Sequence, residues 1–263
     1  MSPRRALAVG AAVLRASVRA DTAYRGAFVA RAGEGIASLT LSIAFYGLIY
    51  TRTDGIEGWT YARILTLAGT FEIVRAIVHA LFIRNLPRLQ DRIRNGELDY
   101  DLLMPVNTRF LVSCRRLSAM SALPAVLGVF LVAAGAAAEA GWPSPGGVAG
   151  YLALLILAVA GNYSLWFLVM CLAFWIEKVD WLQMPYLEAL NLARFPPTVL
   201  PAGVRVAATV LLPAAVSAAL PASVLWGGLG WHVAGFGAGV AATALVSALV
   251  FRRGLLRYEG GTA

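Results

Sequence analysis

Long runs of apolar residues alternate with short polar stretches along most of this chain. Five runs are close to the roughly 20 residues that an α-helix needs to cross a bilayer. These runs are 28–50, 59–83, 110–138, 148–175 and 231–251. We interpret each of them as a transmembrane helix, because sustained apolar character over this length is typical of membrane spans.

The apolar signal breaks up between the fourth and the last of these runs. Residues 181–200 form a short stretch that prolines interrupt, and we interpret it as a further span. Residues 203–226 are apolar but contain Pro213 and Pro221, which indicates a re-entrant helical hairpin. Irregular backbone at membrane depth is tolerated only inside protein or beside a wet cavity, so this hairpin should pack within the bundle. The pattern predicts an all-α integral membrane protein, with six transmembrane helices in a single domain over residues 1–263.

The first 25 residues predict an amphipathic helix that lies in the membrane surface. On a helical projection Arg4, Arg5, Arg15 and Arg19 fall within roughly 100° of arc, and the aliphatic side chains fall outside it. Such a helix is expected along the inner leaflet. The alternative is a basic tail that only sets topology.

Composition agrees with the bilayer as the solvent. The chain is 59% hydrophobic and 14% charged, and its mean hydropathy is +0.72. A soluble domain of this size could not bury so much apolar surface. The net charge of +8 does not indicate a nucleic-acid partner, because the cations lie at the ends of apolar runs.

The distribution of these cations predicts the orientation. If the N-terminus faces the cytoplasm, most arginines and the single lysine, Lys178, lie in cytoplasmic segments, and the outer side carries Arg52, Arg63 and Arg205. Cytoplasmic loops are enriched in basic residues, so both termini are expected in the cytoplasm. The preference for arginine over lysine is typical of a GC-rich genome, and we expect a bacterial plasma membrane.

A dense polar segment, residues 84–109, separates the second and third apolar runs. Its aliphatic residues recur every three to four positions with charges between them, which predicts short amphipathic helices. Pro87 suits a first helical turn, Gly96 permits a bend, and Pro105 ends the segment. We expect the segment to lie flat at the membrane, with three carboxylates facing water: Glu97, Asp99 and Asp101. The alternative is an ordinary solvated loop helix that only sets topology.

The amino-acid sequence of this segment also resembles a known family signature. The run IRNGELDYDLLMPVN, from Ile93 to Asn107, resembles the signature between spans two and three of the type-2 ABC exporter permeases, in their short-chain branch. That signature reads as a basic residue, then GELD, a leucine pair and P-V-N or P-V-S. A second, looser likeness consists of an FW pair followed by proline breaks: Phe174–Trp175, Phe195–Pro196–Pro197, Leu212–Pro213 and Leu220–Pro221–Ala222.

The resemblance implies that residues 84–109 hold a coupling helix, which docks into a groove of a separate ATPase subunit. Six residues would then be the transmission contacts: Arg94, Gly96, Glu97, Leu98, Asp99 and Pro105. The chain departs from the family at Met104, where an arginine is common. A short amphipathic helix suits such docking, because it offers apolar anchors and a charged rim.

The resemblance also implies the assembly. Two permeases, identical or related, would enclose a path above a pair of ATPase subunits that hold ATP and Mg²⁺. The hairpin with Pro213 and Pro221 would form the outer gate. The cargo would be an amphipathic small molecule, a peptide or a lipid, and the pattern leaves open whether it is exported or flipped between leaflets.

The chain has no nucleotide site of its own. A Walker A loop requires G-x-x-x-x-G-K-[ST], whose glycine amides and lysine hold the phosphates. Lys178 is the only lysine, and no glycine lies near it. We therefore expect no cofactor, no metal site and no catalytic residue in this chain.

Ionisable residues inside the second span are candidates for function. Glu72, Arg75 and His79 follow each other at three- and four-residue spacing, so they share one helix face. Intramembrane charges are costly, and these residues could form a structural lock or line the translocation path. A proton relay through His79 is a third interpretation. In the last span Gly235, Gly237 and Gly239 are expected to allow close approach of a helix, either within the bundle or at a dimer interface.

Two other classes of protein stay open. A membrane-embedded lipid-modifying enzyme would need an acid–base or metal cluster at one depth, whereas His79 and His232 are expected at opposite depths. A passive channel or scaffold would leave the polar segment at 84–109 unexplained.

Overall fold

The computed structural model describes most of the chain after residue 24. The described residues are 25–52, 56, 58–83, 85–114, 123–139, 141–201, 203, 205, 213–227 and 230–258. Apart from Arg25, the expected N-terminal interfacial helix lies outside the described residues.

The described chain is helical throughout, as its apolar pattern predicts. The long helices are α2 (Arg25–Arg52), α3 (Tyr61–Val78), α7 (Leu123–Ala138), α8 (Pro145–Cys171) and α12 (Trp231–Arg257). The short α-helices are α4 (Arg88–Arg94), α5 (Leu98–Leu102), α6 (Thr108–Cys114), α9 (Gln183–Asn191) and α11 (Ala219–Val224). A π-helical turn, η1 (His79–Ile83), continues α3, and 3₁₀ turns occur at η3 (Leu172–Phe174), η4 (Asp180–Leu182), η5 (Leu192–Arg194), η6 (Pro197–Val199) and η7 (Pro213–Val216). Within these residues the only strand-type pairing is an isolated bridge between Ile56 and Trp59.

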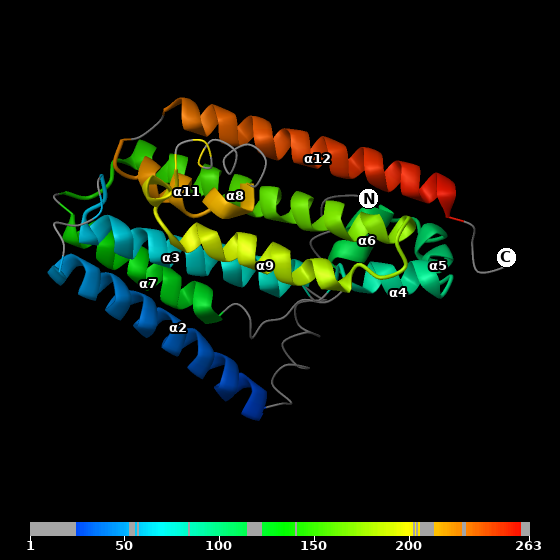
Figure 1. Ribbon diagram of the computed structural model, residues 1–263, viewed down its shortest axis with the longest axis horizontal. Helices are drawn as coiled ribbons and strands as arrows, with labels where there is room; N and C mark the ends of the chain where they lie inside the picture. Colours follow the sequence, from blue (N-terminus) through cyan, green and yellow to red (C-terminus); the bar gives the residue numbers. More distant parts are fainter. Residues whose placement is uncertain are drawn as a thin grey trace.

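The long helices run along a common axis and form a layered bundle (Figure 1). Helix α3 packs on α7 and α8, α12 packs on α8, and α2 lies against α3 and α7. The short helices α4, α5 and α6 gather at one end of the bundle, close to the C-terminal end of α12 (Figure 1). The segment that the sequence singles out is therefore a compact unit at this end.

Among the residues that the structure describes, three helical stretches have the length and apolar character of membrane spans. They are Tyr61–Arg94, Pro145–Phe174 and His232–Arg257. The stretch Pro124–Ala138 in α7 is apolar but shorter. These helices support a multi-pass membrane protein.

The segments expected to hold the fifth span and the hairpin are broken into short helices. Helix α9 has nine residues, which is roughly 14 Å at 1.5 Å per residue, so it is too short to cross the hydrocarbon core alone. The 3₁₀ turns η4 and η5 extend it at both ends. The hairpin region contributes η7 and α11, while residues 206–212 lie outside the description. Proline at positions 196, 197, 213 and 221 explains these interruptions, because it lacks the backbone donor that a helix interior requires.

Glycines bring the backbones of α3 and α7 into direct contact. A Cβ added at Gly69 would lie 2.5 Å from the carbonyl oxygen of Gly128. One added at Gly135 would lie 2.5 Å from the carbonyl oxygen of Ala62. At Gly235 in α12 no atom lies within 4 Å of the added Cβ. The close approach expected at this glycine is therefore not made by the described residues of the same chain, and a dimer interface there stays a prediction.

Candidate functional site

The polar segment between residues 84 and 109 folds as two short helices joined by a turn. Gly96 has φ +72°, a left-handed conformation that glycine adopts without the steric cost of a Cβ. Asn95 caps α4, and its backbone amide donates to the carbonyl of Asp91. The expected bend at Gly96 is therefore present, with α4 before it and α5 after it.

An ion pair closes this turn. The Arg92 guanidinium on α4 donates to the Asp101 carboxylate on α5. The Asp101 side chain is only 2% exposed. The expectation that Asp101 faces water was therefore wrong, because Arg92 neutralises it and allows its burial. Glu97 is exposed, as expected, and Asp99 is half-buried.

One face of the segment is part of the bundle's core. Leu86, Leu89 and Leu98 are fully buried and belong to the same apolar cluster as Phe174 and Val179. Leu98 was expected as a contact with an ATPase subunit. In this structure it packs in the chain's own core, so it holds α5 in place.

Gln90 fastens α4 to the loop that follows α8. Its side-chain amide donates to the Asp180 carboxylate at 3.0 Å, and its carbonyl accepts from the Val179 backbone amide at 2.7 Å. Gln90 and Val179 are buried, so the bond between them is protected from competition with water, whereas Asp180 is exposed. The two bonds connect α4 directly to this loop.

The segment also lies next to the end of α12. Burial, together with the nearby Asp99 carboxylate, raises the pKa of Tyr258 above its ordinary value. Tyr258 directly follows the last residue of α12. Helix α5 is thus placed beside the C-terminal end of a candidate membrane span.

The opposite face of the segment presents apolar side chains to the outside. We call Tyr100, Leu102, Leu103 and Met104 the apolar tip. Leu103 is 83% exposed and Tyr100 is 72% exposed. Within α5 the charged Asp101 thus points inward together with Leu98, while Tyr100 and Leu102 point outward. Exposed contiguous apolar residues of this kind mark contact surfaces.

Three of the expected docking residues flank the apolar tip in the sequence. Arg94, Glu97 and Pro105 are all exposed. Arg94 pairs with Asp91 across one helical turn at 3.4 Å, and both side chains are more than half exposed. The tip thus has a charged rim. Sequence periodicity alone had not distinguished this exposed surface from the buried face of the segment.

The ionisable pair in the second span forms as its spacing predicts. The Glu72 carboxylate accepts from Arg75 at 3.1 Å (Nε) and 2.5 Å (Nη2), and the Ser38 hydroxyl of α2 lies 3.4 Å from it. Glu72 is buried. His79 ends α3 at the start of the π-helical turn.

The two prolines of the expected gate lie in short helical turns. Pro213 begins η7, and Pro221 is buried within α11. Helix α11 contacts both α3 and α8. This part of the expected hairpin is packed inside the bundle.

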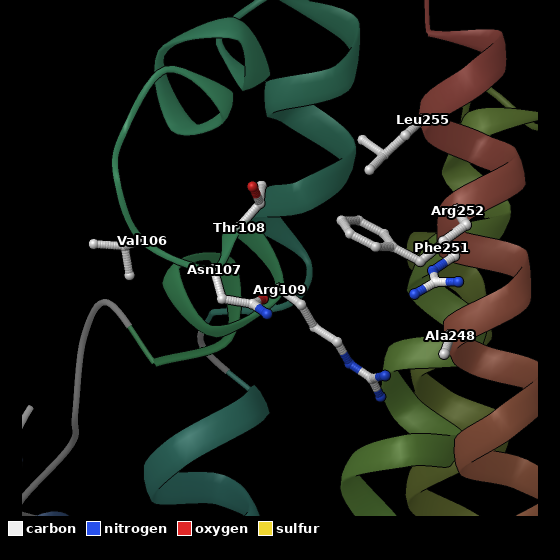
Figure 2. Close-up of a pocket in the computed structure, with 8 residues that line it drawn as sticks. All are labelled: Val106, Asn107, Thr108, Arg109, Ala248, Phe251, Arg252 and Leu255. Atoms are coloured by element: carbon white, nitrogen blue, oxygen red, sulfur yellow. The ribbon is translucent and has the colours of Figure 1, made fainter. Parts of the chain in front are cut away.

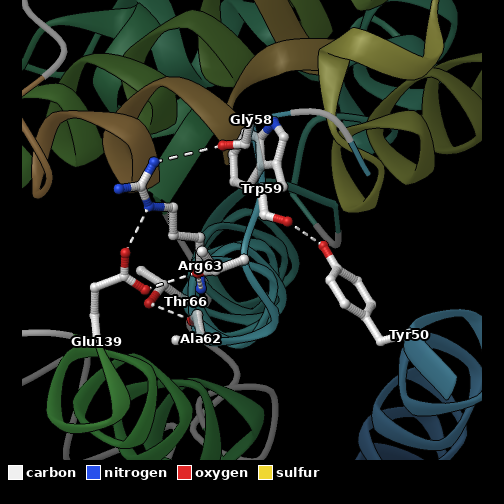
Figure 3. Close-up of polar contacts among 8 residues, drawn as sticks. Tyr50, Gly58, Trp59, Ala62, Arg63, Thr66 and Glu139 are labelled. Carbon is white, nitrogen blue, oxygen red and sulfur yellow. Dashed lines mark hydrogen bonds and ion pairs between the residues drawn. The ribbon is translucent and has the colours of Figure 1, made fainter. Parts of the chain in front are cut away.

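A polar clamp joins the N-terminal end of α3 to the C-terminal end of α7 (Figure 3). The Glu139 carboxylate accepts from Arg63 Nε at 3.0 Å and from the Thr60 hydroxyl at 2.7 Å. Arg63 also donates to the Gly58 carbonyl at 3.4 Å. No local sequence pattern predicts this pairing, because the partners are 76 residues apart.

No group of three His, Cys, Asp or Glu residues in the described part of the chain could hold a metal ion. The arrangement instead combines long apolar helices with a small helical unit fastened to one end, which defines a multi-pass membrane protein. Residues 36–262 match the family described as ABC-2 family transporter protein. The chain belongs to this family, as the resemblance implied, and is a membrane transport permease. No curated protein and no solved structure matches the chain.

Proposed function

We propose that this chain is the membrane-spanning permease subunit of an ATP-binding cassette exporter, driven by a separate ATPase subunit. It would lie in a bacterial plasma membrane, with six spans and both termini in the cytoplasm. The observation that carries this proposal is the apolar tip, which projects from a segment fastened to the bundle. Membership of the ABC-2 family supports the transport role.

The apolar tip supplies the anchors for docking. Leu103 and Tyr100 would enter an apolar groove of the ATPase subunit, and Arg94, Glu97 and Pro105 would form the rim that sets the register. Interfaces of this kind gain most of their affinity from a few central apolar anchors. Gly96, Leu98 and Asp99 would act indirectly, because they shape the turn and hold α5 on the bundle.

Three attachments would carry a push from the ATPase subunit into the bundle. The first is the direct chain connection from α4 through the π-helical turn to α3. The second is the pair of bonds from Gln90 to the loop after α8. The third is the proximity of Asp99 to Tyr258 after α12. Single π-helical turns often occur at functional sites, and this one lies where the segment meets the span.

The motion would reach the outer side through α3 and α7. Their glycine contacts and the Arg63–Glu139 clamp make them move as one body. Helix α11 contacts α3, so a shift of α3 would displace the gate that contains Pro213 and Pro221. Glu72 and Arg75 would then lie beside the path, on a helix that moves during transport.

The complete transporter would contain two permeases, identical or related, and two ATPase subunits that bind ATP and Mg²⁺. The cargo would be an amphipathic small molecule, a peptide or a lipid selected within the bundle.

Copurification tests this proposal. A tagged permease, expressed from its native locus, should retain a protein with a Walker A motif, identified by mass spectrometry. Leu103→Asp should reduce the recovered ATPase subunit at least about tenfold, because a charge in an apolar groove lacks a partner. Leu256→Asp is the matched control, since Leu256 is 88% exposed on α12 and lies outside the tip.

The two variants separate docking from general loss of folding. Equal recovery of the ATPase subunit with Leu103→Asp and with the unchanged chain would contradict the proposal. So would a preparation of the unchanged chain that transports cargo and carries no ATPase subunit.

A further inference from the structure

Arg109 occupies an unusual position as the last residue of the polar segment. It is the second residue of α6, and its guanidinium reaches between α8 and α12. Its Nε donates to the Tyr163 hydroxyl at 3.0 Å, and its Nη2 donates to the Ser247 hydroxyl at 2.9 Å. The charge also lies 4.4 Å from the centre of the Phe167 ring.

All of these partners are neutral. Among the described residues, no carboxylate pairs with Arg109 or with Arg252. A half-buried guanidinium without a counter-ion is costly, and the hydroxyls leave part of its five-donor fork available. An anion that entered from outside the protein would offset this cost.

Arg109 and Arg252 line one cavity of about 460 Å³. Figure 2 shows Arg109 and Arg252 projecting from α6 and α12 into the space between these helices, with Asn107 and Thr108 beside them. Two guanidinium groups with neighbouring amide and hydroxyl groups suit a phosphate, which arginine binds through paired, charge-assisted hydrogen bonds.

A second cavity, of about 550 Å³, lies beside the first one. The two cavities share Asn107 and Arg109. Apart from these and Ser113, the second one is lined by apolar and aromatic side chains: Phe82, Phe110, Ile156, Val159, Ala160 and Tyr163. The combined site has a cationic end and an apolar groove, which matches an amphiphile with an anionic head.

The position of the cationic end along α12 agrees with a lipid headgroup. Arg252 precedes Arg257, the last residue of α12, by five positions, which is roughly 8 Å along the helix axis. The polar headgroup layer on each side of a bilayer has a similar thickness, since it makes up the difference between the hydrocarbon core and the whole membrane.

We propose that this site binds an anionic phospholipid from the adjacent leaflet, with its phosphate between Arg109 and Arg252 and an acyl chain in the apolar groove. The inference rests on the proposed function only for the membrane orientation, because lipid binding requires no ATPase subunit. A failure to bind lipid would therefore leave the docking proposal standing.

Asn107 and Arg109 follow the apolar tip within a few residues. A bound lipid would therefore contact the part of residues 84–109 that leads into the third span. The lipid would then bind next to the surface on which the ATPase subunit is expected to act.

Native mass spectrometry of the full purified chain tests the phosphate half of the site. Phosphatidate should bind, whereas diacylglycerol, which has no phosphate, should bind at least about tenfold more weakly. Arg252→Gln should weaken phosphatidate binding about tenfold. Arg253→Gln is the matched control, because Arg253 is an exposed neighbour on α12 that does not line the cavity.

Arg252 is exposed, so its replacement leaves the fold intact even if Arg109→Gln does not. Equal losses with Arg252→Gln and Arg253→Gln would indicate general attraction to a basic surface and would overturn the proposal. Equal binding of diacylglycerol and phosphatidate would overturn it as well.

A second pair of variants tests the acyl-chain half. Ala160→Phe should fill the groove and weaken phosphatidate binding severalfold, whereas Ala153→Phe, at another exposed position of α8, should not. Inorganic phosphate should compete poorly, because it has no chain for the groove. Competition by inorganic phosphate at the concentrations at which phosphatidate binds would show a free-phosphate site and would contradict the lipid assignment.

Discussion

The Arg92 guanidinium on α4 donates to the buried Asp101 carboxylate on α5, and this contact closes the turn at Gly96. It fixes the angle between the two short helices. The apolar tip begins one residue before Asp101 and ends three residues after it, so its direction depends on this ion pair.

Removal of Asp101 should therefore loosen the segment. Asp101→Ala leaves the mostly buried Arg92 without a counter-ion, and the expected cost is about 3 kcal/mol of unfolding free energy. Thermal unfolding in detergent and proteolysis between residues 95 and 104 measure this effect. Asp91→Ala is the control, because it breaks the exposed pair with Arg94, whose contribution is about 0–1 kcal/mol. Similar melting temperatures and cleavage rates for the two variants would contradict the role of the Arg92–Asp101 pair.

The glycine contact between α3 and α7 predicts a large effect of a single methyl group. In Gly69→Ala the new Cβ would meet the backbone of Gly128 and of Val132 at 2.5 and 2.8 Å. Backbone atoms cannot move aside individually, so the helices must separate, at a cost of about 1–3 kcal/mol. In Gly235→Ala no atom lies near the added group, and the change should be neutral or slightly stabilising. Chemical denaturation in mixed micelles compares the two, and equal midpoints would show that the helices do not touch at Gly69.

The Glu72–Arg75 pair allows a structural lock to be distinguished from a lining of the path. Glu72→Ala alone should destabilise the chain by about 3 kcal/mol, because Arg75 stays in the bundle without its partner. The double variant Glu72→Leu with Arg75→Leu should recover most of that loss. If the pair lines the path, the recovered protein will still transport poorly in reconstituted vesicles. Full transport by the double variant would assign the pair a structural role alone.

The clamp at the other end of α3 should behave as one unit. Glu139→Ala and Arg63→Ala remove partners whose side chains are 15% and 36% exposed, so each should cost only about 0.5–1 kcal/mol. Because the two residues act through the same contact, the double variant should cost less than the sum of the single ones. A double-mutant cycle of unfolding free energies gives the coupling, and a strictly additive result would rule out the contact.

Features that depend on neighbouring residues could be predicted from the sequence. The length of the apolar runs located the long helices, and a three-residue spacing correctly predicted the Glu72–Arg75 pair. The bend at Gly96 followed from the conformational freedom of glycine. Each of these features is determined within a few turns of one helix.

Features that depend on tertiary packing could not be predicted. Gln90 meets Val179 across 89 positions, and Arg63 meets Glu139 across 76, so no local pattern reports them. The inward direction of Asp101 depends on Arg92 being folded back over it across the turn. Periodicity alone assigned this carboxylate to water. The resemblance implied Leu98 as a docking contact, although Leu98 is buried and the nearby Leu103 is exposed.

Site-specific photo-cross-linking from the apolar tip in inside-out membrane vesicles is the most direct test of docking. A photoreactive residue at position 103 should form an adduct with the ATPase subunit, identified by mass spectrometry, and the yield should change when a non-hydrolysable ATP analogue closes the nucleotide sites. The same residue at position 256 should form no such adduct. Adducts with lipid alone from position 103, or equal labelling of the ATPase subunit from both positions, would contradict a coupling segment at residues 84–109.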